Sequence, residues 1–295
     1  MPSLDDLRKR IKSVKSTQKI TKAMKMVAAA KLRKAQESAE KSRPYSEKMM
    51  NVILNLTKSM QETEEAPKLL IGTGSKKIQL CVVMTADRGL CGGFNSNITK
   101  LAKKKFNEIL KEGKELKIIT VGSKGFDQIK REYGKYIVKK FSFKSVGKIS
   151  FNEAEEVGNE IIKMFLNNEF DECSIFYNKF KNVITQIPTA EQIIPPNKEL
   201  KQKSEDNSNQ ESFYEFEPSE NEILDDLLPK NICTQIFKGL LENSASEQGS
   251  RMTAMDNATR NAGDLVEKLT INYNRSRQAA ITKELIEIIS GAESL

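Results

Sequence analysis

The stretch that decides the fold is Ser246 to Ala292, which reads SEQGSRMTAMDNATRNAGDLVEKLTINYNRSRQAAITKELIEIISGA. It contains no proline, and its glycines are isolated. From Leu241 onward, small or less polar residues recur at alternating steps of four and three, which is the spacing of a heptad seam. This C-terminal seam comprises Leu241, Ala245, Gln248, Met252, Met255, Thr259, Ala262, Val266, Leu269, Tyr273, Ser276 and Ala280.

The seam predicts a long helix that winds around a second long helix. A strict seven-residue repeat drifts around a straight helix, so a stripe that keeps facing one partner imposes a left-handed supercoil. A helix from Lys230 to Ser290 would be about 90 Å long, at about 1.5 Å per residue, and no compact domain is that wide. Most of it must therefore project from any globular body and needs a partner helix along its length.

The N-terminal segment supplies a partner. Ser3 and Asp6 form a start signal related to the capping box, and Asp5 and Asp6 suit the helix dipole. An ordinary amphipathic helix on a core is the alternative, but many small residues along a long stripe favour close contact between two helices. The N-terminal seam, again at steps of three and four, comprises Leu4, Leu7, Ile11, Val14, Gln18, Thr21, Met24, Ala28, Leu32 and Ala35.

Between the two helices the pattern changes to alternating strands and helices. The first helix should reach about Ser59, with a kink or a restart at Pro44, and a loop should follow over residues 62–75. Alternation of strands with helices argues for an α/β layer with a largely parallel sheet. We expect strands at residues 78–85, 116–121, 136–141, 173–178 and 183–187, and helices at residues 96–112, 123–133 and 150–166, the last opened by a Ser150–Glu153 capping box.

Pro195 and Pro196 should end this layer. Residues 204–226 contain nine acidic residues and no Lys or Arg, and we interpret residues 197–211 as a mobile loop and residues 213–216 as a late strand. A Ser219–Glu222 capping box should open a short helix that ends before Pro229. The expected domains are an N-terminal coiled-coil helix (residues 1–60), an α/β domain (76–195), an acidic loop with the late strand (196–218) and the C-terminal helix (219–295).

Composition narrows the possible functions. The chain has 295 residues and 38% hydrophobic content, enough for one medium domain with extended helices or for two small domains. It contains no histidine, which removes Ser-His-Asp and Cys-His machinery and disfavours catalytic zinc. The four cysteines are widely spaced, so neither a metal knuckle nor a disulfide framework is indicated. We therefore predict no catalytic, cofactor-binding or metal-ligating residue.

Targeting signals are also missing. No apolar run approaches the ~20 residues that a membrane-spanning helix needs. No secretory apolar region is present, and two aspartates near the N terminus disfavour a transit peptide. The sequence is typical of a bacterial cytoplasmic chain.

The positive charge of the chain is concentrated in the first helix. The formal net charge is +8, yet residues 1–43 alone hold 13 Lys and Arg against four Asp and Glu. A basic helix can bind nucleic acid or another acidic surface. Aromatic residues are absent from this stretch, so it offers no platform on which bases stack. A basic coiled-coil protein that binds nucleic acid or acts as a scaffold remains an alternative.

The glycine loop DRGLCGGF (residues 87–94) offers a third interpretation. Glycines after a strand can expose main-chain N–H groups to a phosphate, which would suit an enzyme that uses Gly89, Gly92 and Gly93. The loop lacks the Lys and Ser/Thr of a P-loop and does not read GxGxxG. A structural tight turn is therefore the favoured interpretation.

Five segments together resemble one family, the gamma subunit of F-type ATP synthase. They cover both ends of the chain and the domain between, and the last fits the family's terminal signature throughout. The segments are KITKAMKMVAAAKLRKAQ (residues 19–36), TADRGLCGGFN (85–95), VGSKG (121–125), SEQGSRMTAMDNAT (246–259) and ITKELIEIISGA (281–292).

The resemblance implies both a fold and a function. The fold is α/β with a long coiled coil: an antiparallel coiled coil of the N- and C-terminal helices with an inserted Rossmann-like α/β domain. The function is the central rotor shaft of the complex, which couples proton flow through the membrane ring to conformational cycling of the catalytic subunits. Such a shaft is a non-catalytic subunit of an enzyme complex. Pro229 departs from this picture because it lies near the expected start of the long C-terminal helix.

The resemblance also implies partners and contact residues. The partners are the hexameric ring of alpha and beta subunits, the epsilon subunit and the membrane c-ring, with one copy of this chain per complex and no nucleic acid. The location is the bacterial inner membrane, peripheral on the cytoplasmic side, in preference to the mitochondrial inner membrane. Lys22, Met24 and Lys25 resemble the face opposite an acidic loop of the catalytic subunits. Arg277, Gln278 and Thr282 resemble a polar contact with a catalytic subunit.

Overall fold

The computed structural model describes residues 3–59, 67–196 and 220–293 and divides into two compact units. Unit 1 consists of Met1–Ala30 and Arg251–Leu295, and unit 2 of Lys31–Ser250. Two long helices, α1 (Leu4–Ser59) and α7 (Glu220–Glu293), each contribute one part to either unit. The predicted loop at residues 197–211 and the predicted strand at 213–216 lie outside the described residues.

The centre of unit 2 is a five-stranded sheet with the order β3-β2-β1-β4-β5. Neighbouring strands are parallel except β4 and β5, which are antiparallel, so the prediction of a largely parallel sheet is confirmed. The order of the four parallel strands is that of a Rossmann-like layer. The strands are β1 (Ile78–Met84), β2 (Glu115–Val121), β3 (Ile137–Phe141), β4 (Glu172–Phe180) and β5 (Gln186–Ile194).

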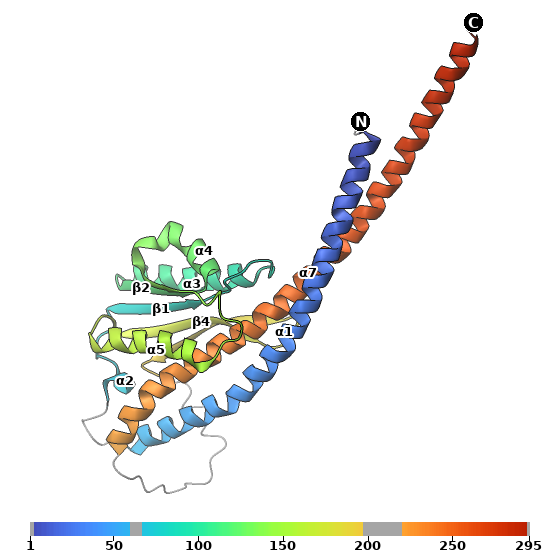
Figure 1. The fold of residues 1–295 in the computed structure, drawn as a ribbon. Coiled ribbons are helices and arrows are strands. Elements are labelled where there is room, and N and C mark those ends of the chain that lie inside the picture. Colours follow the sequence, from blue (N-terminus) through green and yellow to red (C-terminus); the bar gives the residue numbers. More distant parts are fainter. Residues whose placement is uncertain (1–2, 60–66, 197–219, 294–295) are drawn as a thin grey trace. The chain divides into compact units, whose positions relative to one another are not determined.

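Helices cover both faces of this sheet (Figure 1). On one face, Cys81 and Val83 of β1 share a core with α3 (Phe94–Lys111) and α4 (Ser123–Tyr133). On the other face, Leu80, Val82 and Met84 pack with α5 (Phe151–Leu166) and with α7 through Ile232, Ile236 and Leu240. Burial on both faces explains why β1 is an almost unbroken apolar run.

Most of the predicted elements of unit 2 are confirmed, and one strand was misplaced. Helix α4 has the predicted bounds, and the Ser150–Glu153 capping box opens α5 as expected. The strand predicted at residues 183–187 is wrong, because β5 begins at Gln186 and runs to Ile194. Asn182 explains the shift: its side-chain oxygen accepts from the main-chain N–H groups of Ile184 and Thr185, which favours a turn where the apolar pattern indicated a strand. Two short helices not predicted, α2 (Lys68–Ile71) and η2 (Gly134–Tyr136), complete the unit.

The predicted break before Pro229 is wrong, because α7 continues through Pro229 with no separate short helix before it. Helix α1 runs unbroken through Pro44, so the predicted restart there is wrong too, and the kink given as its alternative stays a prediction. A proline inside a helix costs about 3 kcal/mol or more because it removes one hydrogen bond and crowds the preceding turn. Packing on both sides of the proline offsets this cost in α7, where Leu224 and Leu228 cluster with Ile53 of α1 and Ile232 joins the sheet core.

Candidate functional site

In unit 1 the two long helices run antiparallel. The Thr259 hydroxyl donates to the Thr21 hydroxyl at 2.8 Å, and Lys25 Nζ lies 2.6 Å from a carboxylate oxygen of Asp256. Further along, a Cβ placed on Gly263 would lie 3.0 Å from Nε2 of Gln18. Residue numbers on α7 fall as those on α1 rise, which is the antiparallel arrangement that the resemblance implied.

The predicted seams face each other in unit 1. Every predicted seam residue from Leu4 to Ala28 and from Met252 to Ala280 is buried or partly buried. Small side chains are among the buried residues of these seams, namely Thr21, Ala28 and Ala262. The long-helix prediction is therefore confirmed residue by residue, together with the predicted fold class.

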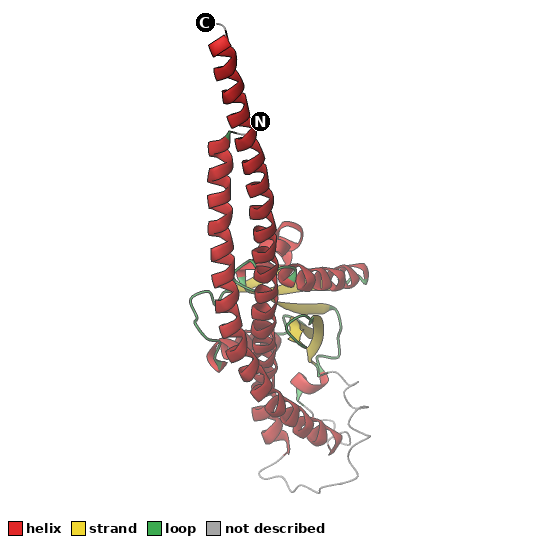
Figure 2. Cartoon of the chain, turned by 90° about the vertical axis from the view of Figure 1, so that its right-hand side faces the viewer, coloured by secondary structure: helices red, strands yellow, loops and turns green. Residues whose placement is uncertain are grey.

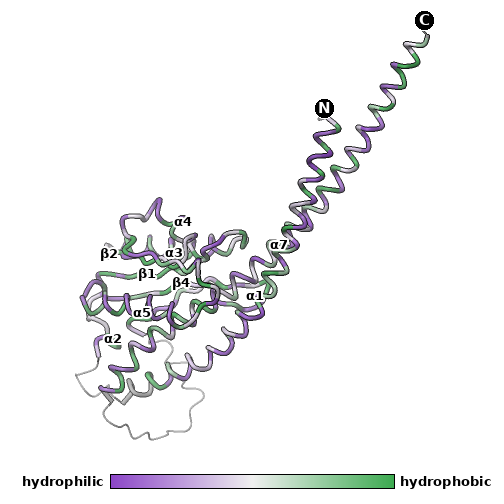
Figure 3. Tube along the Cα trace, viewed as in Figure 1, coloured by the Kyte–Doolittle hydropathy of each residue, from purple (hydrophilic) through white to green (hydrophobic). Residues whose placement is uncertain are grey.

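Beyond Ala280, every residue of helix α7 from 281 to 292 is exposed. Figure 2 shows that α7 runs on past the N terminus of α1, and Figure 3 shows hydrophobic residues at intervals along this part. Large aliphatic side chains that gather at a surface indicate a contact with another molecule. Those exposed in this end are Ile281, Leu285, Ile286, Ile288 and Ile289.

The six contact residues implied by the resemblance form two separate groups. Lys22 is exposed and Met24 is partly buried on the seam. Arg277, Gln278 and Thr282 are exposed on α7, where the Thr282 hydroxyl donates to the Gln278 carbonyl oxygen at 3.0 Å. Because Lys25 lies beside Asp256, roughly 20 residues separate the two groups along α7, or about 30 Å. Their role in partner contact stays a prediction.

Lys25 has a partner that the sequence did not suggest. Asp256 pairs with Lys25 across the seam and with Arg260 along α7. Hydrogen bonds from Arg260 and from Lys25 lower the pKa of Asp256, and hydrogen bonding to Asp256 raises the pKa of Arg260. Spacing indicates a link between Asp256 and Arg260, four residues apart, but a link to Lys25 needs the register of the two helices.

The glycine loop after β1 is held by its own aspartate. The Asp87 carboxylate accepts hydrogen bonds from Ser123 N, Ser123 Oγ, Ser142 Oγ and Phe143 N at 2.7–2.9 Å. Ser123 is the first residue of α4. The Asp87 carboxylate therefore accepts hydrogen bonds from donors at a helix N terminus, the kind of donor that a bound phosphate would need. Gly92 has φ of 56°, which suits a tight turn. The geometry favours the interpretation of this loop as a structural turn.

We expect Asp87→Asn to weaken the dependence of folding stability on acidic pH. Burial acts to raise the pKa of Asp87, but hydrogen bonds from Ser142, Ser123 and Phe143 together hold it below the usual value. The ionised carboxylate therefore stabilises the fold above a pH of about 4, and that stability is lost as pH falls through the lowered pKa. Urea unfolding of both chains across this range measures the effect. An equally steep loss of stability in the variant would contradict it, and Asp225→Asn, at an exposed position, is the control.

Other chemistry-bearing groups are few in the part of the chain that the structure describes. The four cysteines are free and buried, and burial raises the pKa of Cys81 to about 12. No cluster of three or more Cys, Asp or Glu side chains suited to a metal is found among residues 3–59, 67–196 and 220–293. Within the same ranges, no helix combines the length and apolar character needed to cross a bilayer.

Comparison with known sequences gives matches along the whole chain. A family model described as ATP synthase matches residues 3–295. The ATP synthase gamma chain of Pelagibacter ubique is 69% identical over 295 residues and covers all of both chains. The gamma chains of Rhizobium etli and Paracoccus denitrificans are each 56% identical over the same full length.

Solved structures show the same fold. A chain from the central stalk and c-ring of the Tetrahymena thermophila mitochondrial ATP synthase is 26% identical, with a TM-score of 0.60, over 81% of this chain and 99% of that one. A chain from the Euglena gracilis mitochondrial ATP synthase is 21% identical, with a TM-score of 0.67, over 99% of this chain and 94% of that one. Two long terminal helices around an α/β domain are therefore the fold of central-stalk proteins.

Proposed function

Because this chain belongs to the gamma-chain family of ATP synthase, we propose that it is the central rotor shaft of that complex. The observation that carries the proposal is the antiparallel helix pair of unit 1, in which the seam residues predicted from the sequence are the ones that are buried or partly buried. At its end, α7 has exposed aliphatic side chains. A rotor shaft must be stiff, as a pair of long helices is, and it must have a surface that contacts the surrounding subunits. The exposed end of α7 would provide such a contact surface.

The shaft works by mechanical coupling and breaks no substrate bond. Proton flow turns the membrane c-ring together with this chain, and the asymmetric shaft imposes different conformations on the catalytic subunits in turn. Two of the contact residues, Lys22 and Arg277, are exposed charges. Exposed ion pairs contribute only about 0 to 1 kcal/mol each, so contacts made by these two residues break and reform at each step. Lys22, Met24 and Lys25 would face the acidic loop, and Arg277, Gln278 and Thr282 would contact a catalytic subunit on α7.

The partners follow from this role. The alpha and beta subunits would surround the helix pair, and the epsilon subunit and c-ring would bind the α/β domain. One copy would serve each complex, because a single shaft occupies the axis of the ring. The complex would lie at the bacterial inner membrane, with this chain peripheral on the cytoplasmic side.

Reconstitution tests the proposal directly. Membranes that lack this chain should show no ATP-driven proton pumping, and adding the wild-type chain should restore it. Purification through a tag on the chain should bring down two larger nucleotide-binding subunits and the c-ring. Pumping that is the same with and without the chain would contradict the proposal.

The nucleic-acid or scaffold alternative has no support among the comparisons. Its one observation is the charge of residues 1–43, 13 Lys and Arg against four Asp and Glu. Binding through that charge alone would fall steeply as salt rises and would not depend on sequence. Salt-dependent DNA binding by the assembled complex is the result that would revive this alternative.

A further inference from the structure

In unit 2, strand β4 is longer than the strand beside it. The parallel pairing of β1 with β4 runs from Gln79 opposite Glu172 to Val83 opposite Phe176. Strand β4 continues to Phe180, so its last residues have no strand on the β1 side. Buried main-chain N–H and C=O groups need partners, because leaving them unpaired is costly. Asn178 is buried here, and so is Phe180.

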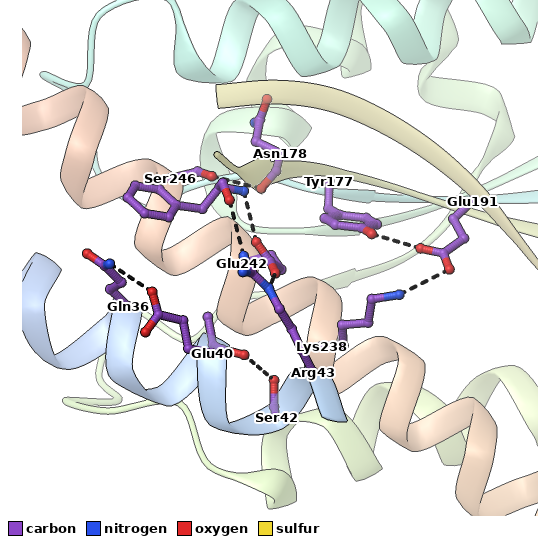
Figure 4. A network of polar contacts seen from close by, with 12 residues as sticks. Gln36, Glu40, Ser42, Arg43, Tyr177, Asn178, Glu191, Lys238, Glu242 and Ser246 are labelled. Atoms are coloured by element: carbon purple, nitrogen blue, oxygen red, sulfur yellow. Dashed lines mark hydrogen bonds and ion pairs between the residues drawn. The ribbon is translucent and has the colours of Figure 1, made fainter. Parts of the chain in front are cut away.

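Side chains of two helices take the place of the missing strand. The Asn178 N–H donates to Oδ1 of Asn243 at 3.2 Å, and the Ser246 hydroxyl donates to the Asn178 carbonyl oxygen at 2.9 Å. Two residues further along, the Phe180 N–H donates to Oε2 of Glu242 at 2.8 Å. The Arg43 guanidinium donates to the Phe180 carbonyl oxygen at 3.1 Å. Figure 4 shows Arg43, Glu242 and Ser246 converging on this end of β4.

An ion pair joins the two helices at the same place. Arg43 Nε of α1 donates to Oε1 of Glu242 of α7 at 2.6 Å. The Glu242 side chain is 1% exposed, whereas that of Arg43 is 33% exposed. A buried carboxylate that loses its partner is strongly unfavourable, so the pair holds α1 and α7 at one relative position. The hydrogen bond from Arg43 to Glu242 raises the pKa of Arg43.

These contacts restrict motions that apolar packing permits. Apolar contacts are not directional, so helices packed only through Leu and Ile side chains slide or turn at modest cost. A hydrogen bond weakens steeply when its angle falls below about 120°. Turning α7 about its axis would misalign Glu242, Asn243 and Ser246 together, and would draw Glu242 away from Arg43.

We infer that Arg43, Glu242, Asn243 and Ser246 form a torque-bearing joint that fixes both shaft helices to β4. The inference rests on the proposed function, because a joint of this kind matters for a chain that transmits rotation. Force applied to the α/β domain passes into both helices through the directional contacts at Asn178 and Phe180. The joint is a positioning device for the coupling, and it touches no substrate.

Two variants weaken the joint without large changes of volume. Glu242→Gln keeps the shape of the side chain but turns one acceptor into an NH₂ group that faces a donor. Ser246→Ala removes one donor and leaves the Asn178 carbonyl oxygen without it. The matched control is Glu132→Gln, because the Glu132 carboxylate of α4 pairs with Lys103 of α3 at 2.8 Å and is not part of the joint.

The experiment measures ATP-driven proton pumping in reconstituted complexes against a small and a large opposing proton gradient. Both joint variants should hydrolyse ATP normally without a gradient and lose pumping against the large gradient, while Glu132→Gln follows the wild type. A merely stabilising role would lower the melting temperature without a load-dependent loss. If Glu242→Gln fails to assemble, Ser246→Ala decides the result.

The outcomes separate the inference from the proposed function. Pumping by Ser246→Ala that matches wild type at every gradient would overturn the joint, whatever its melting temperature. Failure of the wild-type chain to restore pumping to complexes that lack it would instead overturn the proposed function. Amide hydrogen exchange on the full chain adds a local check, because the Phe180 amide should exchange faster in Glu242→Gln.

Discussion

Gly122→Ala is expected to destabilise unit 2 strongly. Gly122 follows β2 with φ of 102°, a conformation that side chains with a Cβ rarely adopt. A Cβ at this position would overlap the Thr85 carbonyl oxygen and lie 2.7 Å from the Thr85 carbonyl carbon, so main-chain atoms must move. Those atoms are fixed, because Thr85 N donates to the Val121 carbonyl oxygen and Gly122 N donates to that of Phe141.

The cost should be a large fraction of the total stability. Overpacking costs about 1–3 kcal/mol and backbone strain adds about 1–3 kcal/mol, against a total of about 5–15 kcal/mol for a domain. Urea unfolding followed by circular dichroism measures the loss. Gly134→Ala is the control, because φ is −53° there and nothing lies within 4 Å of the added Cβ. Equal urea midpoints for the two variants would contradict the prediction, because they would show that the main chain at Thr85 moves at little cost in free energy.

Periodic patterns predicted most of the fold because each element has one dominant environment. Strand β1 is buried on both faces and reads as an apolar run, and α5 opens with a capping box that depends on local contacts alone. Prediction was wrong where a local preference competed with packing. At Pro229 the packing of α7 prevails over the proline, and at Asn182 the turn prevails over the apolar pattern.

The seam of the coiled coil was predictable, but the polar contacts were not. A heptad pattern gives the face of each helix without giving the register that brings Lys25 to Asp256. The joint connects residues 62 to 199 positions apart in the sequence. A charged side chain on a helix that makes such a distant contact looks the same in the sequence as a solvated one. The burial of Glu242, which marks the joint, is seen only in the structure.

Met24→Lys is expected to impair coupling far more than Met24→Ala. Met24 is partly buried on the seam, next to Lys25, and a lysine there would extend its amine to solvent. Asp256 already pairs with Lys25 and Arg260, so the new cation would be left for an acidic group of the surrounding ring. A contact that is stronger in one orientation holds the shaft in that orientation. If the contact raises the barrier for the next rotation step by about 1.4 kcal/mol, that step becomes about tenfold slower.

The two variants separate the added charge from the lost side chain. Both remove the methionine from the seam, so any weakening of the helix pair is shared, whereas only the lysine adds a positive charge. We expect the Met24→Lys complex to assemble with the same subunits as the Met24→Ala complex while it pumps fewer protons per ATP hydrolysed. Raising the salt concentration should recover part of this loss, since exposed charge pairs are screened within a Debye length of about 8–10 Å. Equal ratios of protons to ATP in the two variants, at low and at high salt, would show that no charge-specific contact forms at this position.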